Sequence, residues 1–319
     1  MVYIGLDFTK FVCAILIVYM HTFCYDSTLG LWVREVISTI GVPFFFITSG
    51  FFLYKGMEKS SDNTAYIRKY TKRLLYLYVA WFFISLPVSW YNVSIAHVDY
   101  SFWMKCLYHV RMLLFSGAMG VYWYILAMIL SSWMIYIAIK LKMINACVPI
   151  AIVLFLLGVL YQSGLLQDSF IDRFIHVVFG SERNFLNVGF PYMLIGVVVA
   201  RKNISIPRQF SLCLLILSIL VSTFLMHSKW HFIQLFESLF LFLLIKECNP
   251  QGNSCTNIAV WLRKCSTALY LIHFPFIIAF DYYLQKGTLV DFPVTLCFSF
   301  AVFLLLKRLP DKYVKILFG

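Results

Sequence analysis

Long apolar runs separated by short polar segments dominate this chain of 319 residues. A helix that crosses a bilayer needs about 20 apolar residues, and ten windows of that kind can be placed in order. The predicted spans are residues 4–25, 36–54, 74–95, 121–139, 146–163, 185–200, 209–226, 231–246, 266–285 and 289–306. The pattern predicts an all-α fold, a polytopic transmembrane bundle that forms one domain over residues 1–319.

The Lys and Arg residues between these runs test the count, because basic residues concentrate in cytoplasmic loops. With the N-terminus placed in the cytoplasm, eighteen Lys and Arg fall on the inner side and seven, including Arg34 and Arg183, on the outer side. This asymmetry predicts about ten spans with both termini in the cytoplasm.

The composition excludes soluble classes of protein. The chain is 62% hydrophobic and 13% charged, whereas soluble domains are about 45–50% apolar and ~25% charged. The predicted environment is therefore a lipid bilayer. The formal net charge of +12 is assigned to basic cytoplasmic loops, so no nucleic-acid partner is expected.

The first apolar run carries three ionisable residues, Asp7, Lys10 and His21. Each such group inside a bilayer costs roughly 2.5–3.5 kcal/mol on insertion scales, so it tends to face the protein interior and to serve a function. Lys10 and His21 are eleven positions apart, which places both on one helix face and roughly 16 Å apart along the axis. The spacing predicts a buried face with a cation near one membrane surface and an imidazole much deeper.

A basic cluster precedes the third run and consists of Arg68, Lys69, Lys72 and Arg73. Residues four apart lie on one side of a helix, so the cluster covers two adjacent strips. It is either an ordinary cytoplasmic flank or a patch that binds phosphate through the Arg donor fork. Lys10 at the same membrane face favours the phosphate patch.

Other runs also contain polar residues that need an explanation. Thr48, Ser49 and Gly50 in the second run either let a helix approach closely or present hydroxyls to a cavity. His273 lies inside the ninth run, and Glu237 in the eighth run either lines a polar cavity, pairs with a cation, or is solvated at the membrane edge.

Two longer outer segments, residues 96–120 and 164–184, form either a polar lid or interfacial helices. Cys24 and Cys106 would lie on the outer side, and their pairing is left open. His227 and His231 are four apart but have no evident third ligand, so no metal site is predicted.

Several short motifs occur in order along nearly the whole chain. They are Lys10 and His21 with ten residues between them, the run Pro43–Phe51, the basic cluster that ends at Arg73, Tyr122-Trp123-Tyr124, Phe190–Gly196, and Leu269–His273. Together they resemble the integral-membrane acyltransferase type 3 family. The basic residue of that family is usually Arg, and Lys10 keeps its charge but loses bidentate donation.

The resemblance implies an enzyme that takes an acyl group, commonly acetyl, from cytoplasmic acyl-CoA. It passes the group to a hydroxyl of a cell-surface glycan or lipid-linked acceptor, such as a cell-envelope polysaccharide, in the bacterial cytoplasmic (inner) membrane. The chain is expected to act as a homo-oligomer or with a separate extracytoplasmic partner. No metal cofactor is implied.

The resemblance also suggests roles for residues. His21 would be a general base or an acyl relay, and Asp7 would assist it; Lys10 and the basic cluster would bind acyl-CoA. The substrate-binding residues would be Ser49, Trp123, Glu237, Tyr270 and His273. The alternative function is a membrane transporter or flippase of a small polar or lipid-linked substrate, because buried His, Lys and Glu also mark translocation pathways.

Overall fold

The computed structural model describes residues 3–22, 27–117, 120–178, 183–226, 232–248, 253–283 and 290–318, and they contain helices and no strands. Every predicted run overlaps a helix. In order these are α1 (Ile4–Thr22), α3 (Gly41–Lys59), α4 (Asn63–Ala96), α6 (Trp123–Lys140), α7 (Ile144–Gln162), α9 (Phe190–Arg201), α10 (Arg208–Phe224), α11 (Ile233–Lys246), α12 (Asn253–Tyr283) and α13 (Asp291–Leu306). The all-α fold is confirmed.

Shorter elements complete the described chain. They are α2 (Thr28–Trp32), the turns η1 (Val33–Ile37) and η2 (Ser38–Ile40) that lead into α3, α5 (Phe102–Arg111), η3 (Met112–Ser116), α8 (Phe170–Val178), η5 (Phe185–Gly189) and α14 (Asp311–Phe318). Within the described ranges, five helices are long and apolar enough to cross a membrane, namely residues 4–22, 28–59, 63–96, 123–140 and 144–162. The chain is therefore a multi-pass membrane protein. The count of ten spans stays a prediction.

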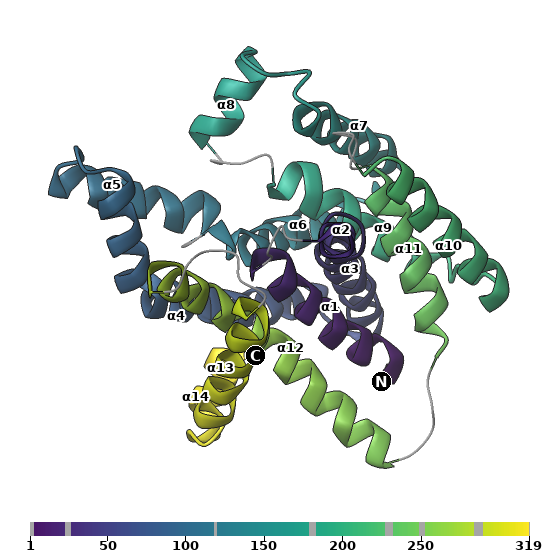
Figure 1. Cartoon of the computed structure of the whole chain (residues 1–319). Coiled ribbons are helices and arrows are strands. Elements are labelled where there is room, and N and C mark those ends of the chain that lie inside the picture. Colours follow the sequence, from purple (N-terminus) through teal and green to yellow (C-terminus); the bar gives the residue numbers. More distant parts are fainter. Residues whose placement is uncertain are drawn as a thin grey trace.

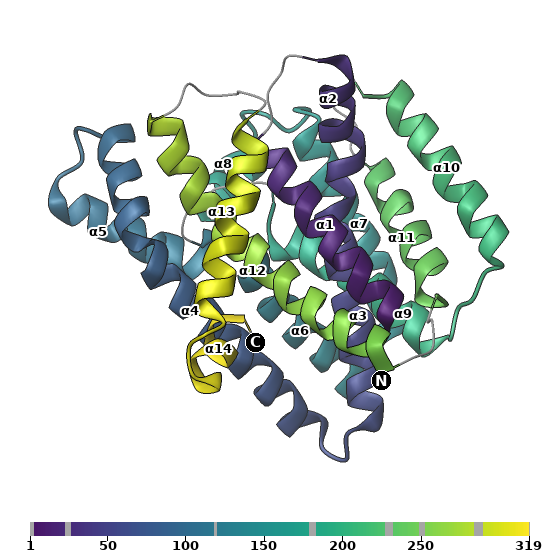
Figure 2. The same cartoon turned by 60° about the horizontal axis from the view of Figure 1, so that its bottom comes forward.

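The helices surround α1 and α3, which lie in the middle of the bundle (Figure 1). Helices α7, α10 and α11 lie on one side of this pair, and α4, α5, α13 and α14 on the other. In Figure 2 both termini lie in the lower half, with the turn between α3 and α4 at the bottom and α2 at the top.

Helices α3 and α9 cross at two glycines. A Cβ on Gly50 would collide with the backbone of Met193, and a Cβ on Gly196 would collide with the carbonyl of Ile47. Small residues at such a crossing let backbones approach closely. The packing interpretation of residues 48–50 is therefore confirmed at Gly50, while the buried Thr48 hydroxyl donates to the Phe44 carbonyl at 2.7 Å.

Hydrogen bonds fix the start of α4 and the position of α14. Asp62 caps α4 by accepting from the N–H groups of Thr64 (2.7 Å) and Ala65 (3.1 Å), and these N–H groups lower the pKa of its carboxyl. Further along α4, the indole N–H of Trp81 donates to the Leu317 carbonyl at 2.8 Å. This bond holds the C-terminal α14 against α4.

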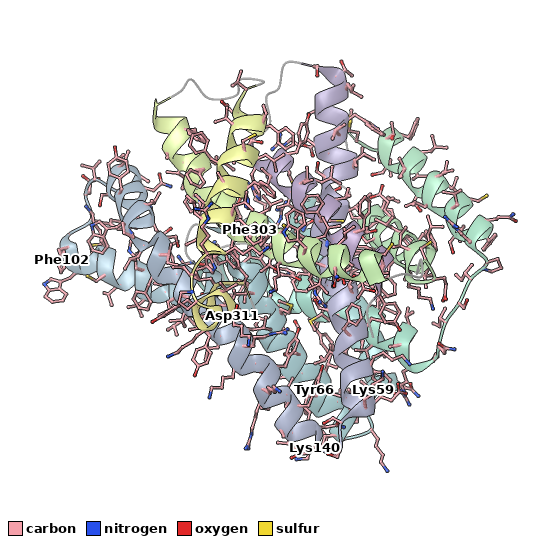
Figure 3. The ribbon with its side chains drawn as sticks, turned by 90° about the horizontal axis from the view of Figure 1, so that it is seen from below. Lys59, Tyr66, Phe102, Lys140, Phe303 and Asp311 are labelled. Atoms are coloured by element: carbon pink, nitrogen blue, oxygen red, sulfur yellow. The ribbon has the colours of Figure 1, made fainter. Side chains whose placement is uncertain are left out.

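The outer segment 96–120 forms an apolar hairpin. Phe102, Trp103 and Leu107 are 62%, 74% and 69% exposed, and Figure 3 shows Phe102 far from the centre of the bundle, with Lys59, Tyr66 and Lys140 together at the opposite lower end. His109 is buried and stacks on Trp90 at 5.0 Å between ring centroids. Exposed aromatic and aliphatic side chains favour the interfacial interpretation over a polar lid.

Candidate active site

A large cavity of about 950 Å³ opens between α1, α3, α4, α6 and α12. We call it the basic cavity, because seven Lys and Arg residues line it: Lys10, Lys55, Lys59, Arg73, Lys246, Arg263 and Lys264. Three carboxylates, those of Asp7, Glu58 and Glu247, also line it, so the cations outnumber the acids. Ser49, Tyr124 and Tyr270 form part of the same wall. The cavity suits a polyanionic ligand.

Lys10 and Asp7 form a pair inside this cavity. The Lys10 ammonium lies 3.7 Å from the Asp7 carboxylate, and their side chains are 14% and 3% exposed. The same ammonium lies 4.7 Å from the centroid of the Phe52 ring, a favourable cation–π distance. Asp7 thus orients Lys10, and it lines the basic cavity rather than the cavity that contains His21.

The basic cluster on α4 contributes one residue to the cavity. Arg73 lines it and lies 5.8 Å from the ring centroid of Tyr70, which lines it too. Arg68, Lys69 and Lys72 are exposed and line neither of the two cavities described here. Arg73 is exposed as well, so the difference is that it lines the basic cavity and the other three do not.

A second cavity of about 460 Å³ contains His21. We call it the histidine cavity; its polar lining residues include Arg34, Glu35, Ser38, Thr39, Gln162, Arg183, Asn187 and Gln234, together with Trp123, Tyr161 and Tyr192. Val42 on α3 lines both cavities. The two cavities thus meet at one side chain, and α1 contributes Lys10 to one and His21 to the other.

His21 and His273 come from distant parts of the chain, and their rings lie close together at a tilt. Their ring centroids are 5.4 Å apart with an interplanar angle of 30°. Nδ1 of the fully buried His273 lies 2.9 Å from the Leu269 carbonyl. A carbonyl only accepts, so Nδ1 donates and Nε2 is left as an acceptor. This Nε2 has no hydrogen-bond partner among the described residues.

Pro275 explains how α12 is held beside His21. Proline has no N–H, so the carbonyl of Leu271, four residues earlier, has no partner within the helix. The Tyr122 hydroxyl donates to this carbonyl at 2.9 Å, and the Tyr270 hydroxyl donates in return to the Val121 carbonyl. The two tyrosines fix α12 against the start of α6, between the two cavities.

Comparison with known proteins now identifies the family. Residues 3–308 match the acyltransferase domain of the acyltransferase 3 family. The chain belongs to this family. The resemblance recognised in the motifs is confirmed.

Two curated proteins from Enterococcus faecalis named amino-acid racemase are also similar to this chain. Each is 26% identical, one over 185 residues (56% of this chain and 25% of the relative) and the other over 160 residues (48% and 22%). The chain therefore spans about a quarter of the length of these relatives. No solved structure matches.

The remaining expected site residues do not all line the same cavity. Ser49 and Tyr270 line the basic cavity, while Trp123 lines the histidine cavity. Glu237 is fully buried on α11 and lines neither, and neither of its oxygens has a hydrogen-bond partner in the described chain. One turn earlier on the same helix, Gln234 lines the histidine cavity instead.

Several lining residues were not singled out from the sequence. Arg263 and Lys264 were counted as loop residues, but α12 begins at Asn253 and carries both into the basic cavity. Arg34 lies far from Arg183 and Asn187 in the sequence, and all three line the histidine cavity. The sequence carries one signal for these two groupings. The count of Lys and Arg by loop places Arg34 and Arg183 on the outer side and the loop cations of the basic cavity on the inner side.

Two expectations fall outside the described residues. Cys24 is not described, so the structure does not address its pairing with Cys106. His227 and His231 are likewise not described.

Proposed function

We propose that this protein moves an acyl group, acetyl in the simplest case, from cytoplasmic acyl-CoA to a hydroxyl of a cell-surface glycan or lipid-linked acceptor. The observation that carries the proposal is the pair of cavities on α1, one lined with cations around Lys10 and one containing His21. The proposed setting is a bacterial cytoplasmic membrane, with ten spans and both termini in the cytoplasm. In this proposal the protein acts as a homo-oligomer or with a separate extracytoplasmic partner.

The donor occupies the basic cavity in this proposal. Coenzyme A carries several phosphate charges, which Lys10, Arg73 and Arg263 would hold by charge-assisted hydrogen bonds. Lys10 and His21 are eleven residues apart on one helix, or roughly 16 Å. The donor must therefore carry its acyl group on an arm well away from its phosphates, which is the layout of an acyl-CoA thioester.

The chemistry takes place beside His21. Neutral imidazole removes the proton of the acceptor hydroxyl as its oxygen attacks the thioester carbonyl. The carbon–sulfur bond then breaks, and the coenzyme A thiolate leaves and takes up a proton. His273, which is held by the Leu269 carbonyl and lies beside His21, positions the base.

Acyl transfer by purified protein in lipid nanodiscs tests the proposal, with labelled acetyl-CoA as donor and a preparation of envelope glycan as acceptor. Removing a general base costs about 10²–10⁴-fold in rate, so His21→Ala should lose transfer by this factor. His97→Ala is the matched control, because His97 stacks on Tyr100 at the end of α4 and lines neither cavity. Full activity in His21→Ala would contradict the assignment.

A transporter is the second candidate. It is favoured by the ionisable residues of α1, because buried His and Lys also mark translocation pathways, and by two cavities that share Val42 in their lining. The relatives named amino-acid racemase suggest amino acids as the test solutes. Proteoliposomes loaded with labelled amino acids and supplied with labelled acetyl-CoA separate the two functions. Solute movement without thioester loss would favour transport.

A further inference from the structure

We infer that the Ser38 hydroxyl holds the thioester carbonyl of the acyl donor and stabilises the oxyanion that forms there during transfer. The inference rests on the proposed function, and it adds a catalytic residue. Attack by the acceptor oxygen moves an electron pair of the carbonyl double bond onto the carbonyl oxygen, while the acceptor proton goes to His21. A preorganised hydrogen-bond donor aimed at that oxygen is usually a large part of catalysis. The proposed reaction therefore needs such a donor beside His21.

Ser38 has a buried hydroxyl that no other group occupies. The residue is 1% exposed, and its Oγ makes no hydrogen bond to any described residue. The hydroxyl of the adjacent Thr39, by contrast, donates to the Val36 carbonyl at 2.8 Å. Other buried hydroxyls without a described partner, such as those of Ser211 and Ser299, line neither cavity, whereas Ser38 lines the histidine cavity. An unpaired buried hydroxyl destabilises the free protein, so a bound substrate would supply its partner.

The packing of η2 against α1 places Ser38 at the level of His21. A Cβ on Gly41 would lie 3.0 Å from the Ile17 side chain, so Gly41 faces α1. Positions i and i+3 of a 3₁₀ turn eclipse each other, so Ser38 shares this face one turn closer to α2. Helices α1 and α3 run in opposite directions (Figure 2), and His21 lies one turn beyond Ile17, also toward α2. Ser38 and His21 both line the histidine cavity.

One face of α3 leads from the basic cavity to Ser38. Residues three and four apart share a helix face, and the series at these spacings consists of Ser38, Val42, Phe45, Ser49 and Phe52. The last four line the basic cavity, and Val42 lines the histidine cavity as well. An acyl group that passes Val42 therefore reaches Ser38 one helical turn further on.

Two other polar side chains are less suited to this role. His273 cannot donate toward the carbonyl, because its Nδ1 donates to Leu269 and its Nε2 offers only a lone pair. Nδ2 of Asn187 is also buried and without a described partner. However, Asn187 lies in η5, which packs against α6, α7 and α9, whereas η2 packs against α1 and thus beside His21.

Steady-state acyl transfer in lipid nanodiscs tests the inference, with labelled acetyl-CoA and the envelope glycan preparation as substrates. Removing one oxyanion donor costs about 10²–10³-fold in kcat, so Ser38→Ala should lose kcat by this factor and keep the KM for both substrates. Ser38→Thr retains a hydroxyl and should recover a large part of this loss. The unfolding midpoint of Ser38→Ala should not fall, because the substitution removes an unpaired buried group.

Ser132→Ala is the matched control. The Ser132 hydroxyl is buried, donates to the Ile129 carbonyl at 2.7 Å and lines neither cavity, so kcat should be unchanged. Full kcat in Ser38→Ala, no gain in Ser38→Thr over Ser38→Ala, or a loss confined to KM would each overturn the inference. An acetyl group bound to Ser38, detected by mass spectrometry after addition of acetyl-CoA alone, would also overturn it, because Ser38 would then be a nucleophile.

The wild type separates a failure of this inference from a failure of the proposed function. If the wild type transfers no acetyl group, the proposed function is wrong and the role of Ser38 is wrong with it. If the wild type transfers acetyl groups and Ser38→Ala does so equally fast, only the role of Ser38 is wrong.

Discussion

The basic cavity and the histidine cavity differ in how their polar groups are held. Five of the seven cations that line the larger cavity are lysines on long flexible stems, and three carboxylates offset the cations. The smaller one uses two arginines, amides and a histidine, several of them on π-helical turns. Flexible cations suit a set of phosphates, whereas planar donors at fixed positions suit one acceptor geometry.

The same helix serves both cavities. Lys10 and His21 both lie on α1 but line different cavities, and Val42 on α3 lines both. The comparison teaches that the two cavities share one side chain, which we call the partition. In the proposed function, an acyl group carried from Lys10 toward His21 passes this side chain.

Filling the partition should produce the largest effect. Val42→Trp adds an indole where the cavities meet, so the acyl group can no longer reach His21. We expect loss of transfer by about 100-fold, since misplacement by 1 Å can cost that much, with acetyl-CoA binding retained. Single-turnover transfer and a donor-binding titration measure the two quantities.

Val42→Ile is the control for this substitution, because it adds one methyl group and should lose far less. If Val42→Trp transfers acyl groups normally, the acyl group does not take the route past residue 42.

Removing the charge of Lys10 should weaken donor binding in the basic cavity and leave the histidine cavity unaffected. Lys10→Met by itself leaves Asp7 buried without a counter-charge, which costs about 3–5 kcal/mol, so the informative variant is Lys10→Met with Asp7→Asn. We expect the KM for acetyl-CoA to rise by roughly 10–100-fold, as for loss of charged hydrogen bonds.

Lys10→Arg should retain donor binding, because it restores the charge and adds a donor fork. A fall in kcat with unchanged KM in the double variant would place Lys10 in the chemistry instead.

Disturbing the crossing of α3 and α9 should affect both cavities together. Gly50→Ala forces a Cβ against the Met193 backbone, and overpacking of this kind costs about 1–3 kcal/mol. The helices carry Ser49 toward one cavity and Tyr192 toward the other. We expect a lower unfolding midpoint and parallel losses of donor and acceptor binding.

Ser49→Ala is the neighbouring control for Gly50→Ala, since it adds no volume at the crossing. Unchanged stability in Gly50→Ala would mean that the two helices separate without cost.

The smallest effects should come from the basic cluster. Arg73→Gln removes a residue that lines the basic cavity and should raise the KM for acetyl-CoA by about tenfold, equivalent to 1.4 kcal/mol. Arg68→Gln removes an exposed residue outside it and should change the KM little. Equal effects would mean that the cluster acts through its general field, which added salt would screen.

Apolar periodicity was sufficient to predict the helices. Each predicted run overlaps a helix, because backbone hydrogen bonds in a membrane must be satisfied within the segment. The boundaries were less certain: α12 begins at residue 253 rather than 266, since Arg263 and Lys264 end the apolar window while the helix continues. The Asp7, Lys10 and His21 positions were also readable, because each is costly in lipid.

The sequence alone therefore determined that the chain is a helical membrane protein, and its motifs indicated the acyltransferase family. Only the tertiary structure decided which polar residues meet. It placed His273 against His21, chose Arg73 from the basic cluster, brought Arg34 to the cavity of Arg183 and Asn187, and left Glu237 outside both cavities. The physical reason is that hydropathy and spacing act within one helix, whereas these contacts depend on how α3, α9 and α12 cross.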